Sequence, residues 1–204
     1  MFERFWHRQY DYNMPATIRY PQIPITDLLQ VPANALPKKA ALLYEDAEMS
    51  FYEMRSLVIR MSGCLADLGV KKGDRVGIHL INCPQYLIAY YATLSLGAIV
   101  VGLNPAYPQE ELAMVVKNTR LSTIFTLEEA AGRIRELRKG TAIERVILVH
   151  RLDYAQKKGP GVTLPLEAGE YSFQALLDAH PEVRRPRVSV ETTDPAVIQF
   201  TGGT

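Results

Sequence analysis

The chain has 204 residues, which is long enough to bury one sizeable hydrophobic core. Its 23 Lys and Arg residues nearly balance its 22 Asp and Glu residues, so the net charge of +1 gives no argument for nucleic acid or an anionic membrane as a partner. Cys64 and Cys83 lack metal-ligand spacing and suggest no disulfide framework, and the segment after Met1 lacks the apolar stretch of a signal peptide. We therefore expect a cytoplasmic location in a reducing compartment.

Residues 1–37 are expected to form an irregular, proline-rich lead to the folded domain. Prolines at positions 15, 21, 24, 32 and 37 interrupt any long helix or strand. Phe2, Phe5 and Trp6 are apolar side chains in this lead. Packing against the chain's own domain is favoured for them over a partner subunit or a lipid surface, and they are assigned no function.

Residues 38–204 are expected to form the domain, beginning with a strand at residues 40–44 and a turn at residues 45–47. Ser50 and Glu53 have the spacing of a capping box, because each side chain can pair with a free backbone N–H at a helix start. The helix that follows carries apolar residues at helical spacing on one face, namely Met54, Leu57, Val58, Met61, Leu65 and Leu68. Gly69 then ends it.

The stretch between Arg75 and Glu110 contains no Lys, Arg, Asp or Glu, so it is either a membrane span or a buried core. Its densest part, residues 86–103, is interrupted by Thr93, Ser95 and two glycines. The pattern divides into a strand at residues 75–81, a helix at residues 84–96 and a strand at residues 98–103. Two nearly continuous apolar strands around a helix are typical of a parallel sheet covered on both faces, so the core interpretation is favoured.

The rest of the chain continues the alternation. Helices are expected at residues 108–118, 128–139 and 172–179, strands at residues 122–126, 145–149 and 196–200, and an exposed excursion at residues 151–171. The charges of the second helix, including Arg133, Arg135, Glu136 and Arg138, are expected to form a solvated face. The fold class is therefore α/β, with a mostly parallel sheet and flanking helices.

No catalytic constellation is apparent. The histidines at positions 7, 79, 150 and 180 form no cluster, and His79 is expected to be a satisfied core residue. The sequence contains no nucleophile elbow, dinucleotide fingerprint or Walker loop. One segment has a physical rationale for binding: Thr201-Gly202-Gly203-Thr204 follows an apolar strand, and paired glycines let backbone N–H groups approach a phosphate. A tight turn explains the two glycines equally well.

Four stretches in order resemble the N-terminal part of the adenylate-forming (AMP-binding) acyl-CoA synthetase family. They are Met49-Ser-Phe-Tyr-Glu-Met54, Gly73-Asp-Arg-Val-Gly77 with Asn82-Cys-Pro84, Leu96-Gly-Ala-Ile-Val-Val-Gly-Leu-Asn-Pro105, and Phe200-Thr-Gly-Gly-Thr204. The last resembles the first half of the family's phosphate-binding loop. Gly203, where many members carry Ser, is similar to the long-chain fatty acid–CoA ligase branch. The resemblance covers roughly residues 26–204.

The resemblance implies a two-step reaction in which a fatty acid attacks ATP to give an acyl-adenylate and pyrophosphate, and CoA then displaces AMP. The implied cofactors are ATP, CoA and Mg²⁺. Thr201, Gly202, Gly203 and Thr204 are the residues implied to contact ligand; no catalytic residue and no metal ligand is carried over. A homodimer and peripheral contact with a membrane are left open.

The sequence stops halfway through the loop, so the chain alone is expected to be an inactive, truncated part of the large domain. The family's acyl pocket and its mobile lid with a catalytic lysine would lie downstream. A ligase for aryl or other carboxylic acids is the alternative within the family. Outside it, the alternative is a non-catalytic binding or assembly module.

Overall fold

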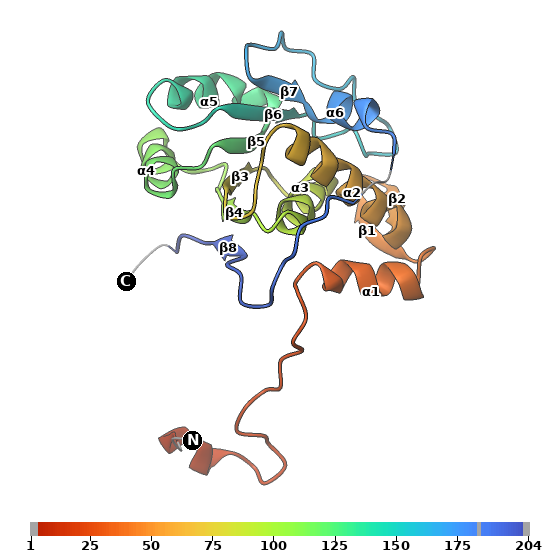
Figure 1. The fold of residues 1–204 in the computed structure, drawn as a ribbon, viewed down its shortest axis with the longest axis vertical. Helices are drawn as coiled ribbons and strands as arrows, with labels where there is room; N and C mark the ends of the chain where they lie inside the picture. The colour runs from red at the N-terminus through yellow and green to blue at the C-terminus, as the bar shows by residue number, and fades with distance from the viewer. Residues whose placement is uncertain (1–3, 183–184, 202–204) are drawn as a thin grey trace.

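A computed structural model describes residues 4–182 and 185–201, and its centre is a six-stranded, all-parallel sheet. The strand order is β7-β6-β5-β3-β4-β8. The strands are β3 (Arg75–His79), β4 (Ile99–Gly102), β5 (Thr123–Leu127), β6 (Arg145–Val149), β7 (Glu170–Ser172) and β8 (Val197–Ile198). Figure 1 shows β7 and β8 at opposite edges of this sheet. The predicted α/β class is confirmed.

Helices cover both faces of the sheet. α2 (Phe51–Asp67), α3 (Pro84–Ser95) and α6 (Phe173–Ala179) pack on one face, and α4 (Gln109–Thr119) and α5 (Ala131–Arg138) pack on the other. Alternate residues of β5 and β6 enter the two separate apolar clusters: Phe125 and Ile147 belong to the α2–α3 side, whereas Ile124 and Val146 belong to the α4–α5 side. This alternation follows from the period of two along a strand.

The uncharged central stretch is core. It forms β3, α3 and β4, and Ile88, Ala89 and Ala92 of α3 are fully buried. Gly97 ends α3 in the left-handed region, with a φ of 64°. None of the helices among the described residues combines the length and apolar character needed to cross a bilayer.

The capping box at the start of α2 is confirmed. The Glu53 backbone N–H donates to Ser50 Oγ at 3.2 Å, and the Ser50 backbone N–H donates to Glu53 Oε2 at 2.8 Å. The helix then buries Met54, Val58 and Met61 against the sheet. The predicted cap at Ser172 is also present, since its Oγ accepts from the Ala175 N–H at 3.4 Å.

Two elements near the start of the domain were not predicted. The first is α1 (Asp27–Ala35), which lies inside the expected irregular lead and contains Pro32. Proline inside a helix costs stability, but α1 buries Leu29 and Ala33 and packs on α2. The second is β2 (Ala47–Ser50), which pairs antiparallel with β1 (Ala40–Tyr44) to form a separate two-stranded sheet. The single helix expected at residues 128–139 begins instead as a 3-10 turn, η2 (Glu128–Ala130), before α5.

The expectation that the charges of α5 form a solvated face is wrong for its three arginines. Arg135 pairs with the buried carboxylate of Glu170 at 2.7 and 2.8 Å. Arg138 donates to the backbone carbonyls of Ala168 and Glu144, and Arg133 binds the loop after β4. These side chains therefore attach α5 to neighbouring segments.

The expectation that the aromatic residues of the lead pack on the domain is also wrong for those described. Phe5 lies in a short 3-10 helix, η1 (Phe5–Gln9), and is 80% exposed, and Trp6 is 39% exposed. Figure 1 shows this segment projecting away from the sheet and its helices. Phe2 falls outside the described residues.

Candidate functional site

The candidate site lies at the carboxyl edge of the sheet, where β4 and β8 end side by side. β8 pairs with β4 through Val197 opposite Val100 and Ile198 opposite Val101. The strands are parallel, so the residues that follow β8 emerge beside those that follow β4. Thr201 is exposed at this edge. The other predicted site residues, Gly202, Gly203 and Thr204, lie outside the described residues.

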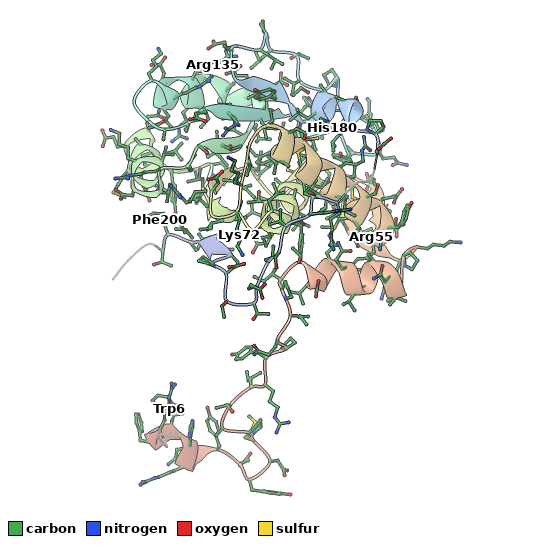
Figure 2. All side chains as sticks on the ribbon, viewed as in Figure 1. Trp6, Arg55, Lys72, Arg135, His180 and Phe200 are labelled. Atoms are coloured by element: carbon green, nitrogen blue, oxygen red, sulfur yellow. The ribbon has the colours of Figure 1, made fainter. Side chains whose placement is uncertain are left out.

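Two contacts fix the segment between β8 and Thr201. Phe200 packs against the apolar cluster beneath α4, and Figure 2 shows it on the segment that leaves β8. Gln199 lies over β4 at Gly102, where a Cβ atom would come within 2.7 Å of Gln199 Oε1. The Gln199 amide can therefore occupy this position only because Gly102 has no side chain.

The loop that follows β4 is held in position from α5. Asn104 Oδ1 accepts from the Ala106 N–H at 2.9 Å, which closes a local turn. Arg133 donates to Gln109 Oε1 at 2.7 Å, to the Pro105 carbonyl at 3.2 Å and to the Tyr107 carbonyl. One guanidinium thus holds two points of the loop that borders the site and the first residue of α4.

His79 ends β3 at the same edge but is closed to solvent. It is 1% exposed, and its Nδ1 lies 2.9 Å from Thr126 Oγ1. Burial lowers its pKa to about 4, and the positive charge of Arg133 adds to this shift. Its Nε2 has no hydrogen-bond partner among the described residues. The expected satisfied core histidine is therefore only half satisfied, and it is too buried to serve as a base toward a ligand at the surface.

No other nucleophile or base meets the site within the described residues. His180 pairs with Asp67 at 2.8 Å beside α6, and His150 lies 3.6 Å from Asp153 after β6. Burial raises the pKa of the Cys64 thiol to about 11, which keeps it protonated and unreactive at neutral pH. In the described parts of the chain, no three His, Cys, Asp or Glu side chains gather as a metal site.

A separate hollow of about 470 Å³ lies between the β1–β2 hairpin, α2 and the segment at residues 154–158. Its wall is mostly apolar and includes Leu42, Met49 and Leu57. Two of its polar groups are engaged: Glu53 caps α2, and Arg60 donates to the carbonyls of His180 and Leu177. The Tyr154 hydroxyl also lines the hollow and has no hydrogen-bond partner among the described residues. This hollow presents no catalytic group.

Sequence reasoning anticipated that Thr201 follows a strand at the carboxyl edge of the sheet, but it missed the groups around this residue. Gly102, Gln199 and Arg133 become neighbours of the site only through the strand order, in which β8 lies beside β4 although most of the domain separates them in sequence. The one usable signal was a glycine inside an apolar strand, which indicates close approach of another group.

The structure places Thr201 at the carboxyl edge of a parallel sheet of the α/β class, and comparison with known proteins identifies the family. The family model of AMP-binding enzymes matches residues 29–204, and the chain belongs to this family. It is 26% identical over 212 residues to a long-chain-fatty-acid–CoA ligase of Bacillus subtilis, covering 98% of the chain and 38% of that protein. A crotonobetaine/carnitine–CoA ligase of Salmonella paratyphi A is 29% identical over 179 residues, covering 84% of the chain and 32% of that protein.

Solved structures have the same fold. A long-chain-fatty-acid-CoA ligase from Archaeoglobus fulgidus superimposes with a TM-score of 0.76 at 22% identity, covering 96% of this chain and 37% of that one. An anthranilate CoA ligase in complex with anthranoyl-AMP gives 0.77 at 18% identity, covering 89% and 33%. The chain thus spans about a third of the length of these proteins.

Proposed function

We propose that the chain is the first part of a fatty acid–CoA ligase, and that its carboxyl edge contributes half of an ATP-phosphate site. The observation that carries this proposal is the delivery of Thr201 by β8 to the sheet edge beside β4. Ligands of open parallel sheets bind at this edge. The reaction would join a fatty acid to ATP as an acyl-adenylate with release of pyrophosphate, and CoA would then displace AMP.

The role proposed for residues 201–204 is to hold the β- and γ-phosphates. The hydroxyls of Thr201 and Thr204 would donate to phosphate oxygens, and Gly202 and Gly203 would let backbone N–H groups approach them closely. Fixed donors around the leaving pyrophosphate stabilise the charge that develops there. Mg²⁺ would neutralise phosphate charge when bound, and no described residue is assigned as its ligand.

A fatty acid is proposed as the acyl substrate, and an aryl or other carboxylic acid is the second candidate. The first is supported by the likeness to the Bacillus ligase and by Gly203. The second is supported by the likeness to the crotonobetaine/carnitine and anthranilate ligases. Activity of a longer polypeptide containing this chain, measured across fatty acids of different length and aryl acids, would distinguish them. Cytoplasmic location also belongs to the proposal.

The coding sequence after Thr204 provides the first test. A continuation as Thr-Gly-x-x-Lys-Gly is expected, and any other continuation would count against the phosphate site. The 204-residue chain by itself is expected to show no fatty-acid-dependent exchange between ATP and pyrophosphate, because it holds only half of the loop. Robust exchange by this chain would show that it is not catalytically incomplete.

A pair of glycine substitutions tests the loop in a polypeptide that extends beyond it. Gly203→Val is expected to lower exchange by about 100-fold or more, because the side chain would occupy the approach to the phosphates. Gly132→Ala is the matched control, since a Cβ atom at Gly132 meets open space. Equal activity of both variants would contradict a phosphate role for Gly203.

A further inference from the structure

We infer that Arg133 is a positioning residue of the proposed ATP-phosphate site. It holds the loop between β4 and α4, whose Tyr107 packs on the same apolar cluster as Phe200, and it thereby sets how Thr201 leaves β8. This inference rests on the proposed function. It gives a role to an arginine of α5 that is distant from Thr201 in sequence and that acts through other residues.

The loop at residues 104–108 has little support of its own. Asn104, Ala106 and Pro108 are exposed, and only Pro105 and Tyr107 are half-buried. The hydrogen bonds within the loop all belong to one turn. The Ala106 N–H donates to Asn104 Oδ1 at 2.9 Å, and the Tyr107 N–H donates to the Asn104 carbonyl at 3.0 Å. Exposed loops with few buried contacts open locally, so the conformation of this loop depends on contacts from other segments.

Arg133 supplies such contacts from α5. Its guanidinium donates to the Pro105 carbonyl at 3.2 Å, to the Tyr107 carbonyl and to Gln109 Oε1 at 2.7 Å. The Gln109 amide donates in return to the Arg133 carbonyl at 3.3 Å, so these two residues are joined in both directions. A guanidinium presents its donors in a rigid planar fork, which lets one side chain hold several acceptors in fixed positions.

An apolar cluster connects the loop to Thr201. Tyr107 from the loop and Phe200 from the segment after β8 both pack against this cluster, which includes Leu103 and Leu112. Figure 2 shows Phe200 on the side of the domain where Figure 1 shows α4. Close-packed side chains transmit a displacement of one member to the others. Because Phe200 directly precedes Thr201, a shift of Tyr107 should reach the start of the proposed phosphate loop.

Charge is the competing explanation for any effect of Arg133 on an anionic ligand. Within the described parts of the chain, Arg133 forms no ion pair, whereas Arg135 of the same helix pairs with Glu170. The positive charge of Arg133 also reaches the end of β3, where it helps to lower the pKa of His79. A lysine would keep this charge but lacks the planar fork, so the two explanations predict different results for Arg133→Lys.

The link between the loop and Thr201 can be tested in the 204-residue chain by NMR. In Arg133→Met, the Ala106 and Tyr107 amides should exchange with solvent several-fold faster, because the loop loses its contacts with α5. The signals of the Phe200 ring and of the Thr201 amide should shift at the same time. Unchanged Phe200 and Thr201 signals would overturn the inference, because the loop would then not be coupled to the site.

Arg138→Met is the matched control for this measurement. Arg138 lies on the same helix and also donates to backbone carbonyls, but these belong to Ala168 and Glu144, at the other edge of the sheet. The control should leave the signals of the loop and of Thr201 unchanged. Equal shifts in both variants would overturn the inference, because any disturbance of α5 would then produce them.

The consequence for ATP is measured in a polypeptide that extends beyond the phosphate loop, through exchange between ATP and pyrophosphate. Arg133→Met and Arg133→Lys are both expected to raise KM for ATP by about tenfold and to leave KM for the carboxylic acid unchanged. Gln109→Ala removes one of the three acceptors and should raise KM for ATP by about threefold, which keeps the inference testable if the Arg133 variants do not fold. Arg138→Met should keep both KM values.

The outcomes separate this inference from the proposed function. A normal KM for ATP in Arg133→Lys alone would overturn the inference in favour of charge, and a normal value in Arg133→Met would overturn it outright. Either result leaves the proposed function standing, provided that the original polypeptide catalyses the exchange and Gly203→Val does not. Absence of exchange in the original polypeptide would instead refute the proposed function, and the inference with it.

Discussion

The two edges of the six-stranded sheet are held by different interactions. At the β7 edge, the Glu170 carboxylate is fully buried, accepts two hydrogen bonds from Arg135 and takes a third from the Glu167 N–H at 2.9 Å. At the β8 edge, the strand has two residues, and the segment leading into it is tied back by the exposed Lys72. Its ammonium group lies 2.6 Å from Asp194 and 3.0 Å from the Ser189 carbonyl.

This difference indicates which part of the sheet opens first. A bidentate pair between Arg135 and the buried Glu170 carboxylate is a strong charge-assisted interaction. The pair between Lys72 and Asp194 joins side chains that are 42% and 22% exposed, so it contributes less and is screened more by salt. Within the described residues, no strand pairs with the outer side of β8. The outer strand β8, which leads to Thr201, should therefore have a lower local stability than β7. Low local stability is common for segments that bind ligands.

The largest change in the free energy of unfolding is expected at His79, at the centre of the sheet. Its protonation at acid pH lowers the stability of the whole domain. Its pKa of about 4 lies below the ordinary value of 6.5, so the unfolded chain takes up this proton first as the pH falls. This group should cost about 3 kcal/mol of unfolding free energy between about pH 7 and pH 4, and the loss should disappear in His79→Met. Urea unfolding across this range measures it.

His7→Met is the control for the His79 measurement, because His7 lies in η1, outside the core. It should retain the pH slope of the original chain. If His79→Met kept that slope as well, burial of the imidazole would not be the source of the acid sensitivity.

A smaller loss of unfolding free energy is expected from a substitution in the outer strand β7. Glu170→Gln should lower the free energy of unfolding by about 2 kcal/mol at neutral pH, because it weakens hydrogen bonds between charged groups. The Arg135 hydrogen bonds hold the pKa of Glu170 below its ordinary value of 4.5. Its contribution is therefore present above pH 4.5 and is lost as the pH falls through the lower folded-state value, so the difference between variant and original chain should shrink there.

Glu136→Gln is the matched control for Glu170→Gln. Glu136 pairs with Lys139 at 2.7 Å, but both side chains are mostly exposed. No measurable change is expected, since exposed pairs contribute little. If both variants lost the same unfolding free energy, the pair between Arg135 and Glu170 would not stabilise the fold more than an exposed pair does.

The centre of the fold was more predictable from sequence than its edges because its signals are local. The helix before Gly69 and the β3–α3–β4 unit follow from apolar periodicity, a capping box and a terminating glycine, all of which act within a few residues. α1 was missed because its stability comes from packing Leu29 and Ala33 on α2, which outweighs the proline inside it.

The candidate site was predictable only where it depends on chain order. Thr201 follows a strand, so its place at the carboxyl edge could be anticipated. Two contacts could not be anticipated: the hydrogen bonds of Arg133 around the loop after β4, and the position of Gln199 over Gly102. Each contact joins segments that are distant in sequence and that only the tertiary fold brings together. The arginines of α5 were assigned to solvent because composition does not reveal that backbone carbonyls and the buried Glu170 lie opposite them.

The smallest change in global stability is expected from Lys72→Met. This substitution also compares the local opening of β8 with that of β7 most directly. The methionine keeps an apolar stem over Gly97 but removes the ion pair with Asp194. Global stability should change little, while the Val100 amide, which donates to the Ala196 carbonyl at 2.9 Å, should exchange with solvent several-fold faster. The Val146 amide, which donates to the Gly169 carbonyl at 2.9 Å beside β7, should keep its rate. Hydrogen exchange measured residue by residue reports the exchange rates of both amides.

High salt should have the same effect on the original chain as the substitution has, because salt screens the ion pair between Lys72 and Asp194. If neither treatment moved Val100, backbone pairing and the packing of Phe200 would hold β8 without the ion pair; if both amides accelerated together, the two edges would open as one unit.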